Sequence, residues 1–312
     1  MDKLFLEKIE EAEIITIFAH HYPDGDCVGS EMGLKEILLA NYPGKKVYAL
    51  GENSYRWQKI FGPVDTISDE ELDKSLAIIV DHNSYKRCGD QRIHRISNGL
   101  RFDHHIGEID GFPFPAIVDE DAVSASQIIL EFALRVGWII PQDALDALCI
   151  AFFDDRRQYT EFNRPVRTEQ MENLFLSLGA DAAKALDIVL NKDSTTLDYE
   201  AKISKNCKVF GDIIVAVMQK EDYESLEYPY PEAGAKGDFL LSLRPAQVAL
   251  LFTYSDNEIR LSARSRSGFS VAALCAYFGG GGHLQAAGAT FSPDFPIELV
   301  VSKAQEMLDS EK

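Results

Sequence analysis

Short runs of β-branched and other apolar residues alternate with helical patterns along the first half of the chain, and this alternation limits the possible folds most. The runs cover residues 14–19, 46–50, 76–80, 99–102 and 116–118. The helical patterns cover residues 28–40, 123–136, 142–153 and 168–190. Strands that alternate with helices form a parallel sheet with helices packed on its faces. We therefore predict an α/β fold with a doubly wound, mainly parallel sheet.

The second half of the chain has a different pattern, which predicts a second, smaller domain of mixed α/β type. We expect strands at 212–218 and 239–243, a polar loop at 221–237, and a hairpin whose strands flank residues 255–257. A short helix at 270–278 and a final helix at 296–308 complete this half. Because 312 residues exceed the usual size of one hydrophobic core, we predict domains at 1–190 and 201–312, joined by a linker at 191–200.

Composition excludes some classes of partner. Asp and Glu number 50 against 31 Lys and Arg, which gives a formal net charge of −19. Such a chain is poorly suited to coating long duplex DNA, because that binding depends on cationic side chains. No apolar run approaches the roughly 20 residues that a membrane helix needs, so we expect no membrane partner. Five cysteines without a CxxC pair predict a reducing compartment, the cytoplasm.

Acidic and histidine side chains follow the predicted strands and one helix, where an open α/β sheet binds its ligands. These residues are His20, Asp24, Asp26, Asp81, Asp103, His104, His105 and Asp155. Carboxylates crowded at one sheet edge repel one another unless cations hold them together. Imidazole and carboxylate suit manganese, zinc or iron, and the lack of a cysteine partner argues against a closed zinc site. Two divalent ions would balance four Asp charges and make the site tolerable for a phosphate.

Each of these positions also has a purely structural interpretation. An Asp after a strand is often a turn former or a helix N-cap, and a lone His is commonly structural. That interpretation must account for four separate strand or helix ends that all carry Asp or His. The set as a whole therefore favours an open metal site.

The order of these motifs resembles a known family. His20 with Asp24-Gly25-Asp26 and Gly29-Ser30, then Asp81, then Asp103-His104-His105, then Asp155 resemble the four motifs of the DHH phosphoesterase superfamily. Residues 279–283 and 286–288 resemble the glycine-rich signature of the DHH-associated C-terminal domain. The length resembles that of stand-alone NrnA-type oligoribonucleases and pAp phosphatases rather than the longer RecJ-type exonucleases.

The resemblance implies two divalent ions, manganese first, with magnesium or cobalt as alternatives. The implied ligands are His20, Asp24, Asp26, Asp81, His104 and Asp155, with Asp81 bridging the ions. His105 would contact the scissile phosphate or protonate the leaving alkoxide, and Asp103 would fix an imidazole tautomer. The consecutive backbone amides of Gly280, Gly281 and Gly282, with the side chain of His283, can bind an anion. Arg264 is the expected partner of a substrate phosphate, and Arg157 is a further candidate contact.

Arg156 and Arg157 depart from the family pattern, in which a small Thr-Gly pair commonly follows the aspartate. Two guanidinium groups at this place could clamp a phosphate, or they could form an ordinary surface network with nearby acids. The sequence leaves both interpretations open.

The function implied by the resemblance is hydrolysis of short RNA or of dinucleotides such as pApA to 5′ mononucleotides. Removal of the 3′ phosphate from pAp and cleavage of cyclic di-AMP are related possibilities, and a homodimer is expected by similarity. Two alternatives remain at this point: a pyrophosphatase or exopolyphosphatase, and a nucleotide-binding module with weak catalysis.

Overall fold

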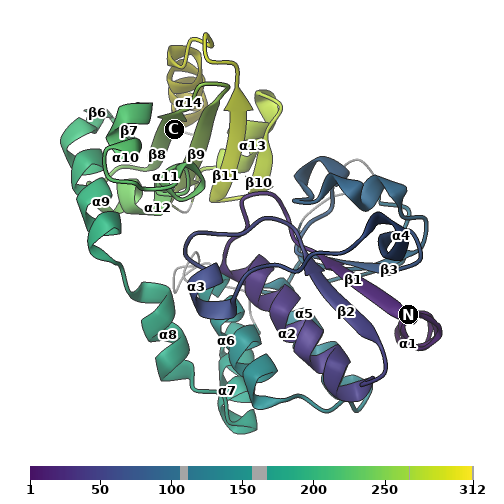
Figure 1. The fold of residues 1–312 in the computed structure, drawn as a ribbon. Helices are drawn as coiled ribbons and strands as arrows, with labels where there is room; N and C mark the ends of the chain where they lie inside the picture. Colours follow the sequence, from purple (N-terminus) through teal and green to yellow (C-terminus); the bar gives the residue numbers. More distant parts are fainter. Residues whose placement is uncertain (106–111, 157–166, 267, 311–312) are drawn as a thin grey trace. The chain divides into compact units, whose positions relative to one another are not determined.

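The computed structural model describes residues 1–105, 112–156, 167–266 and 268–310. The chain forms two compact units, Met1–Asn191 and Lys192–Lys312. Each unit has its own sheet and its own helices, which confirms the predicted α/β class (Figure 1). No helix in the described ranges is long and apolar enough to cross a membrane.

Within the described residues, the N-terminal unit contains a five-stranded parallel sheet in the order β2-β1-β3-β4-β5. The strands are β1 (Ile14–Phe18), β2 (Lys46–Leu50), β3 (Leu76–Val80), β4 (Gly99–Asp103) and β5 (Ala116–Val118). The chain moves from β1 to β2 on one side and then crosses back to β3 on the other. The strand order therefore reverses beside β1 and β3, which is where open α/β sheets bind ligands.

Helices cover both faces of this sheet because successive residues of each strand point to opposite sides. On one face lie α1 (Asp2–Glu11), α2 (Gly25–Asn41), α5 (Ala125–Arg135) and α6 (Gln142–Arg156), with Ile78 among their contacts. The neighbouring Ile79 belongs to the core on the other face, under α4 (Asp69–Leu72) and the 3-10 turns η1 (Tyr85–Arg87) and η2 (Gln91–Arg95). Figure 1 shows α2, α5 and α6 side by side against the sheet. A short helix, α3 (Gln58–Phe61), follows β2.

Two helix boundaries differ from the sequence prediction. Helix α2 begins at Gly25 rather than at residue 28, because the Asp24 side chain caps it by accepting a hydrogen bond from the Cys27 amide. The predicted helix at 168–190 is two helices, α7 (Thr168–Leu178) and α8 (Ala182–Leu190). Gly179 ends α7 in the left-handed region, with φ 95°.

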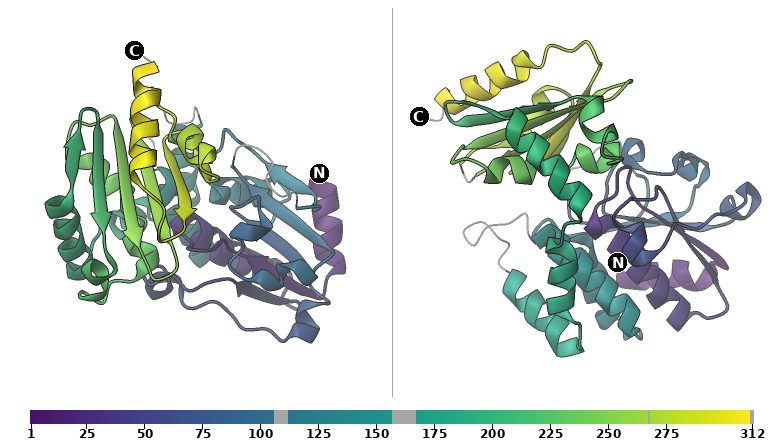
Figure 2. Two further views of the ribbon diagram at one scale, coloured as in Figure 1. Left: turned by 90° about the horizontal axis from the view of Figure 1, so that it is seen from above. Right: turned by 60° about the vertical axis from the view of Figure 1, so that its left-hand side comes forward.

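The C-terminal unit contains, within the described residues, a six-stranded mixed sheet in the order β10-β11-β9-β8-β7-β6. The strands are β6 (Lys208–Phe210), β7 (Ile213–Met218), β8 (Val248–Tyr254), β9 (Ile259–Ser265), β10 (Gly281–His283) and β11 (Ala286–Phe291). Strands β7 and β8 are parallel, whereas β8 and β9 form the predicted antiparallel hairpin. One face of the sheet packs on α13 (Val271–Tyr277) and α14 (Glu298–Ser310). Figure 2 shows α14 along this face.

The opposite face of that sheet carries α9 (Ser194–Asn206), α10 (Lys220–Glu224), α11 (Tyr230–Ala233) and α12 (Gly237–Ser242). The prediction of a strand at 239–243 is wrong, because α12 occupies this segment and Leu240 belongs to the same apolar core as Ala249 and Leu251 of β8. A short apolar run fits a buried strand or a buried helix equally well by periodicity. The polar stretch expected as a loop contains α10 and α11, and α9 begins within the expected connector.

Candidate metal centre

The residues singled out in the first half of the sequence meet at the carboxyl ends of β1, β3 and β4. His20 lies just beyond β1, Asp81 directly follows β3, and His104 directly follows β4. Asp155 comes from the last turn of α6, and Asp26 from the first turn of α2. All five side chains are buried, and hydrophobic packing does not explain the burial of such polar groups. The structure thus brings four remote segments together beside the reversal of strand order.

Asp81 lies between the two buried histidines. Its Oδ2 atom is 3.4 Å from Nε2 of His20, and its Oδ1 atom is 3.2 Å from Nε2 of His104. The backbone of Asp81 has φ 61°, a left-handed conformation that residues other than glycine, asparagine and aspartate rarely adopt. This conformation turns the chain at the end of β3, where the Asp81 carboxylate reaches both histidines.

His20 is oriented by the backbone. Its Nδ1 atom donates a hydrogen bond of 2.9 Å to the carbonyl oxygen of His21, so Nε2 faces the carboxylates. Besides Asp81, Nε2 has Oδ1 of Asp24 at 3.8 Å. Asp24 is therefore both the N-cap of α2, as the structural interpretation of the sequence allowed, and a neighbour of the histidine.

His104 is oriented in the same way on the other side of Asp81. Its Nδ1 atom donates to the carbonyl oxygen of Ala122 at 3.3 Å, and Nε2 lies 3.3 Å from Oδ2 of Asp155. The same Nε2 is 3.8 Å from Oδ2 of Asp26.

The carboxylate of Asp26 is fixed by the start of α5. It accepts hydrogen bonds from the amides of Ala125 and Ser126, at 2.6 and 3.2 Å, and from the hydroxyl of Ser30 at 3.0 Å. Amides at a helix N-terminus lack acceptors within their own helix and stabilise a negative charge. The start of α5 therefore determines where the Asp26 carboxylate lies.

Burial and crowding shift the pKa of nearly every member of the cluster. Burial raises the pKa of Asp155 to about 7, and burial with the charges of Asp81 and Asp155 raises that of Asp26 well above its usual value. Burial opposes ionisation of Asp81 too, but His104 and His20 hold its pKa well below the usual range. For His104, burial is outweighed by Asp155 and Asp81, which hold its pKa well above 6.5. Without metal, the cluster must therefore retain protons to offset its carboxylate charges.

The donor set fits divalent metal ions. Asp81 Oδ1 is buried and accepts no hydrogen bond from any residue that the structure describes, although His104 Nε2 lies 3.2 Å away. This oxygen and this ring nitrogen repel at such a distance unless a proton or a metal ion lies between them. Both histidines donate through Nδ1 to backbone carbonyls, the arrangement that usually orients metal-binding imidazoles. The oxygen and imidazole donors suit a divalent ion of borderline hardness.

Cys27 is one neighbour of this cluster that the sequence argument missed. Its sulfur, with ligand atoms of His20 and Asp81, forms a group whose members lie within 4.8 Å of one another. We expected no cysteine beside these residues, and this expectation is wrong, because Cys27 lies next to His20 and Asp81. Burial raises the pKa of Cys27 to about 12, and its sulfur accepts a hydrogen bond from the His20 amide. The thiol is thus held in its neutral form against the backbone.

Asp103 and His105 form a hydrogen-bonded pair beside the cluster. Oδ1 of Asp103 accepts from Nδ1 of His105 at 2.8 Å, and Oδ2 accepts from Arg101 at 2.9 Å. Asp103 thereby fixes the ring orientation of His105, whose Nδ1 also lies 3.7 Å from Asp81. Burial lowers the pKa of His105, and the charge of Arg87 lowers it further. The hydrogen bond to Asp103 acts in the opposite direction and raises it.

Arg87 is a second residue that the sequence argument missed. Its charge lowers the pKa values of both His105 and the buried His82, so the guanidinium lies near this edge of the sheet. Within the described part of the chain, that guanidinium makes no hydrogen bond or ion pair with another residue. Its place six residues after Asp81 was the available signal, but sequence alone does not show which way η1 turns.

His21 and His82, which directly follow His20 and Asp81 in the sequence, differ in environment. His21 is exposed and pairs with Glu52, whose Oε1 lies 2.6 Å from Nδ1. His82 is fully buried, and its Nδ1 donates to the carbonyl oxygen of Val80 at 2.9 Å. Burial lowers the pKa of His82 to about 3, so this ring is neutral.

The residues predicted to contact substrate lie outside this cluster or outside the described ranges. Arg156 donates to Glu172 at 2.7 Å, which favours the surface-network interpretation for this side chain. Arg157 lies outside the described residues. In the C-terminal unit, Arg264 donates through Nε to Asp238 at 2.8 Å.

The glycine-rich segment is packed against a neighbouring strand. Gly280 donates its amide to the carbonyl of Cys275, and a Cβ at Gly280 would lie 2.1 Å from the carbonyl oxygen of Gly288. Gly281, Gly282 and His283 form β10, which pairs with β11. Close backbone approach explains glycine here, and an anion-binding role stays a prediction for Gly280, Gly281, Gly282 and His283.

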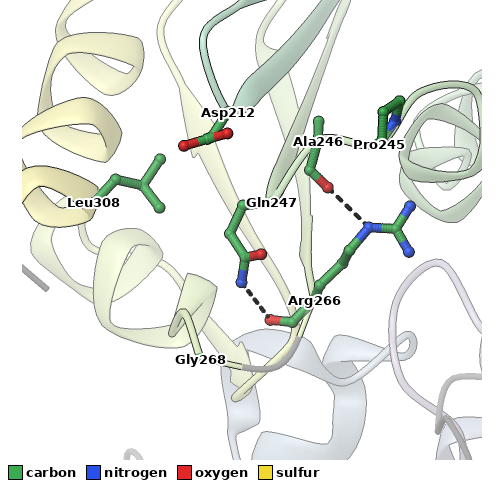
Figure 3. Close-up of a pocket in the computed structure, with 7 residues that line it drawn as sticks. All are labelled: Asp212, Pro245, Ala246, Gln247, Arg266, Gly268 and Leu308. Carbon is green, nitrogen blue, oxygen red and sulfur yellow. Dashed lines mark hydrogen bonds between the residues drawn. The ribbon is translucent and has the colours of Figure 1, made fainter. Parts of the chain in front are cut away.

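A cavity of about 640 Å³ opens in the C-terminal unit (Figure 3). Asp212, Gln247, Arg266 and Leu308 are among the residues that line it. Nε of Arg266 donates to the Ala246 carbonyl at 2.9 Å, and Nη2 donates to the carbonyls of Leu241 and Arg244 at 3.2 and 3.4 Å. Arg266 therefore stabilises a loop beside this cavity.

Comparisons with known proteins agree with this architecture. The family model "DHH family, N-terminal domain" matches residues 14–152, and the "DHHA1 domain" matches residues 231–310. A Mycoplasma pneumoniae protein named bifunctional oligoribonuclease and PAP phosphatase NrnA is 28% identical over 307 residues, which cover 96% of this chain and 94% of that protein.

Two solved structures share the fold. An exopolyphosphatase-related protein from Bacteroides fragilis has a TM-score of 0.79 at 21% identity, with 99% of this chain and 95% of that chain covered. RecJ from Thermus thermophilus in complex with Mn²⁺ has a TM-score of 0.53 at 16% identity, with 99% and 53% covered. With the family matches and the full-length relative, these comparisons identify the chain as a member of the DHH family that carries a DHHA1 domain.

Proposed function

We propose that this chain is a metal-dependent phosphoesterase that hydrolyses short oligoribonucleotides or linear dinucleotides such as pApA to 5′ mononucleotides. The observation that supports this most is the position of Asp81 between His20 and His104, in contact distance of both. The named activities of the Mycoplasma pneumoniae relative, oligoribonuclease and PAP phosphatase, support the same substrate class.

Two groups of side chains would hold the metal ions. We assign His20, Asp24 and Asp81 to one ion, and Asp26, Asp81, His104 and Asp155 to the other. Divalent ions at such a place supply charge neutralisation for the phosphoryl oxygens and lower the pKa of attacking water. We propose Mn²⁺, with Mg²⁺ or Co²⁺ as alternatives, because the donors are imidazole nitrogens and carboxylate oxygens and a solved RecJ structure contains Mn²⁺.

His105 is the proposed contact to the reacting phosphate. Asp103 fixes the ring through Nδ1, and we propose Nε2 as the atom that meets the substrate. Burial lowers the pKa of His105, but an approaching anionic phosphate opposes that effect and favours protonation. Protonated Nε2 would then donate to a phosphate oxygen or to the leaving alkoxide.

Arg87 is the proposed positive charge for the substrate phosphate in the N-terminal unit. Its guanidinium lies near His105 and is unpaired among the described residues, whereas the chain as a whole carries a net charge of −19. A planar guanidinium can bind two phosphate oxygens at once. Arg87 could thus attract the substrate locally despite the acidic surface.

We keep the remaining substrate contacts and the assembly as proposals. Arg264, Gly280, Gly281, Gly282, His283 and Arg157 would bind the rest of the substrate, and the active form would be a homodimer. Arg264 would exchange its bond to Asp238 for a phosphate, since Arg binds carboxylates and phosphates with similar geometry.

A substrate panel tests the proposed activity. Purified protein with Mn²⁺ is offered pApA, a five-residue RNA, pAp, cyclic di-AMP and pyrophosphate, and Asp81→Asn serves as the control. We expect turnover of pApA or the short RNA that is abolished by chelation and reduced at least about 100-fold in Asp81→Asn. Turnover of pyrophosphate alone would indicate a pyrophosphatase. Tight nucleotide binding without metal-dependent turnover would indicate a binding module.

A further inference from the structure

Gly25, which separates Asp24 from Asp26, is enclosed by two buried side chains. Its amide donates a hydrogen bond of 2.7 Å to Oδ2 of Asp154, a residue 129 positions away in α6. A Cβ at Gly25 would lie 2.5 Å from that same oxygen and 2.5 Å from Cζ2 of Trp57. Asp154 and Trp57 are only 1% and 4% exposed. The space at this position is therefore closed on two sides.

The hydrogen bond to Asp154 has a clear local purpose. The Gly25 amide belongs to the first turn of α2, whose amides have no acceptor within the helix. The Asp24 side chain accepts from Cys27, so Asp154 supplies the acceptor for Gly25. A carboxylate at a helix N-terminus is also stabilised by the helix dipole. Asp154 thus fixes the backbone between two side chains of the metal centre.

The tandem acids Asp154 and Asp155 consequently face different partners. Asp155 lies with its Oδ2 atom 3.3 Å from Nε2 of His104, whereas Oδ2 of Asp154 lies against the Gly25 amide. Consecutive helix residues point about 100° apart, so one position of α6 reaches His104 and its neighbour reaches the start of α2. The order of the two acids in the sequence does not reveal this division.

Trp57 forms the second wall and is itself held from two sides. Its amide donates to Oγ of Ser54 at 3.3 Å, which starts the turn that carries the ring. The preceding residue, Arg56, donates through Nη2 to the carbonyls of Ile188 and Val189, at 2.7 Å each. These bonds attach the loop after β2 to the end of α8. The indole therefore presses on Gly25 from an anchored position.

We propose that Asp154 is a positioning residue of the metal centre, which with Trp57 clamps Gly25 and so sets the separation of Asp24 and Asp26. The inference rests on the proposed function only in that the cluster binds divalent ions. Partners that orient metal ligands commonly change metal affinity 10- to 100-fold when they are removed. Asp154 acts here through a backbone amide, because the ligands it positions are the neighbours of Gly25.

Two substitutions at this position test the proposal. Asp154→Ala removes the acceptor, whereas Asp154→Asn keeps a carbonyl oxygen of the same reach. We expect Asp154→Ala to weaken Mn²⁺ binding, measured by calorimetry without substrate, by about tenfold or more. Asp154→Asn should recover the affinity to within about threefold, because it retains the hydrogen bond. Asp143→Ala, at an exposed position of the same helix, is the matched control and should leave the affinity unchanged.

Amide exchange of Gly25 in the metal-free protein gives a readout that does not depend on metal or turnover. The Gly25 amide should be protected in the wild type and in Asp154→Asn, and exchange at least about tenfold faster in Asp154→Ala. If Asp154→Ala does not fold, Trp57→Phe is the second test. It replaces the indole beside Gly25 with a smaller ring and should still weaken Mn²⁺ binding.

The proposal is overturned if Asp154→Ala folds, binds Mn²⁺ like the wild type and keeps the Gly25 amide protected. It is also overturned if Asp154→Asn is as defective as Asp154→Ala, which would assign Asp154 a charged role as a ligand. If the wild type itself binds no Mn²⁺, the proposed function fails, and the exchange of the Gly25 amide still decides whether the clamp exists.

Discussion

Glu31 is a buried acid that the metal centre does not use. It lies on α2, is completely inaccessible to solvent, and neither of its carboxylate oxygens makes a hydrogen bond with a described residue. Burial raises its pKa well above the 4.5 of an exposed glutamate. The folded protein therefore keeps this carboxyl protonated at pH values where the unfolded chain releases the proton.

This shift predicts a pH-dependent effect of Glu31→Gln on stability. Because the folded pKa is raised, the contribution of Glu31 is complete below about pH 4.5 and is lost as the pH rises toward the folded pKa. Glu31→Gln should thus gain stability over the wild type between pH 5 and pH 8, by up to about 1.4 kcal/mol per pH unit. Urea unfolding of the metal-free proteins across this range measures the difference.

A matched change tests whether the effect belongs to the buried site. Glu36 lies on the same helix but is exposed, so Glu36→Gln should leave the free energy of unfolding nearly unchanged. Parallel stability curves for the wild type and Glu31→Gln would show instead that Glu31 is ionised in the folded protein.

At the scale of elements, the contact between α2 and α6 determines how close two parts of the metal centre come. A Cβ at Gly29 would lie 2.7 Å from the Cβ of Ala151 and 2.8 Å from the carbonyl oxygen of Ala147. Helix α2 carries Asp26 and α6 carries Asp155, which both face His104. A larger residue at 29 would push these helices apart.

Gly29→Ala should therefore reduce both stability and metal affinity. We expect a loss of about 1–3 kcal/mol in the free energy of unfolding, the usual effect of an extra methyl in a closed contact. Mn²⁺ affinity should fall with it, since the two carboxylates separate. Gly44→Ala is the control, because a Cβ there would meet no atom within 4 Å. Equal stability of Gly29→Ala and the wild type would mean that the helices adjust without cost.

The elements that carry the centre could be predicted from sequence, whereas the contacts among them could not. The buried runs of β1, β3 and β4 have a clear pattern, so the polar residues at their ends could be identified. Helix α12 was predicted as a strand, since a short apolar run is compatible with either state.

The neighbours of the centre depend on tertiary structure. Arg87 approaches His105 from a 3-10 turn, and Asp154 reaches Gly25 across 129 residues. The spacing of Arg87 from Asp81 does not show which way η1 turns, and no periodicity in the sequence connects Asp154 with Gly25. Cys27 could be placed on the first turn of α2 only once the helix was known to begin at Gly25.

At the scale of the whole molecule, each unit has the cores that an independent domain requires. The apolar clusters of Met1–Asn191 lie on both faces of its sheet, and those of Lys192–Lys312 do the same. The six side chains that we propose as metal ligands, from His20 to Asp155, all belong to the first unit. Folding and metal binding should therefore be separable from the second unit.

Expression of the units apart checks this expectation. Residues 1–191 alone should fold and bind Mn²⁺ with an affinity within about tenfold of the full chain, because all assigned ligands are present. Residues 192–312 alone should show cooperative thermal unfolding and bind no Mn²⁺. Circular dichroism and calorimetry measure both. An N-terminal fragment that stays unfolded, or that folds without binding Mn²⁺, would show that the units depend on each other.

The left-handed backbone at Asp81 restricts which substitutions at this position can be interpreted. Alanine would remove the carboxylate. It would also hold a residue with little tolerance for the left-handed region in that conformation, at a cost of roughly 1–2 kcal/mol. Asparagine tolerates the same dihedral angles and has nearly the same shape, so it isolates the loss of charge. A mutational scan of this family member would therefore overstate the chemical importance of residue 81 for every substitution except asparagine and glycine.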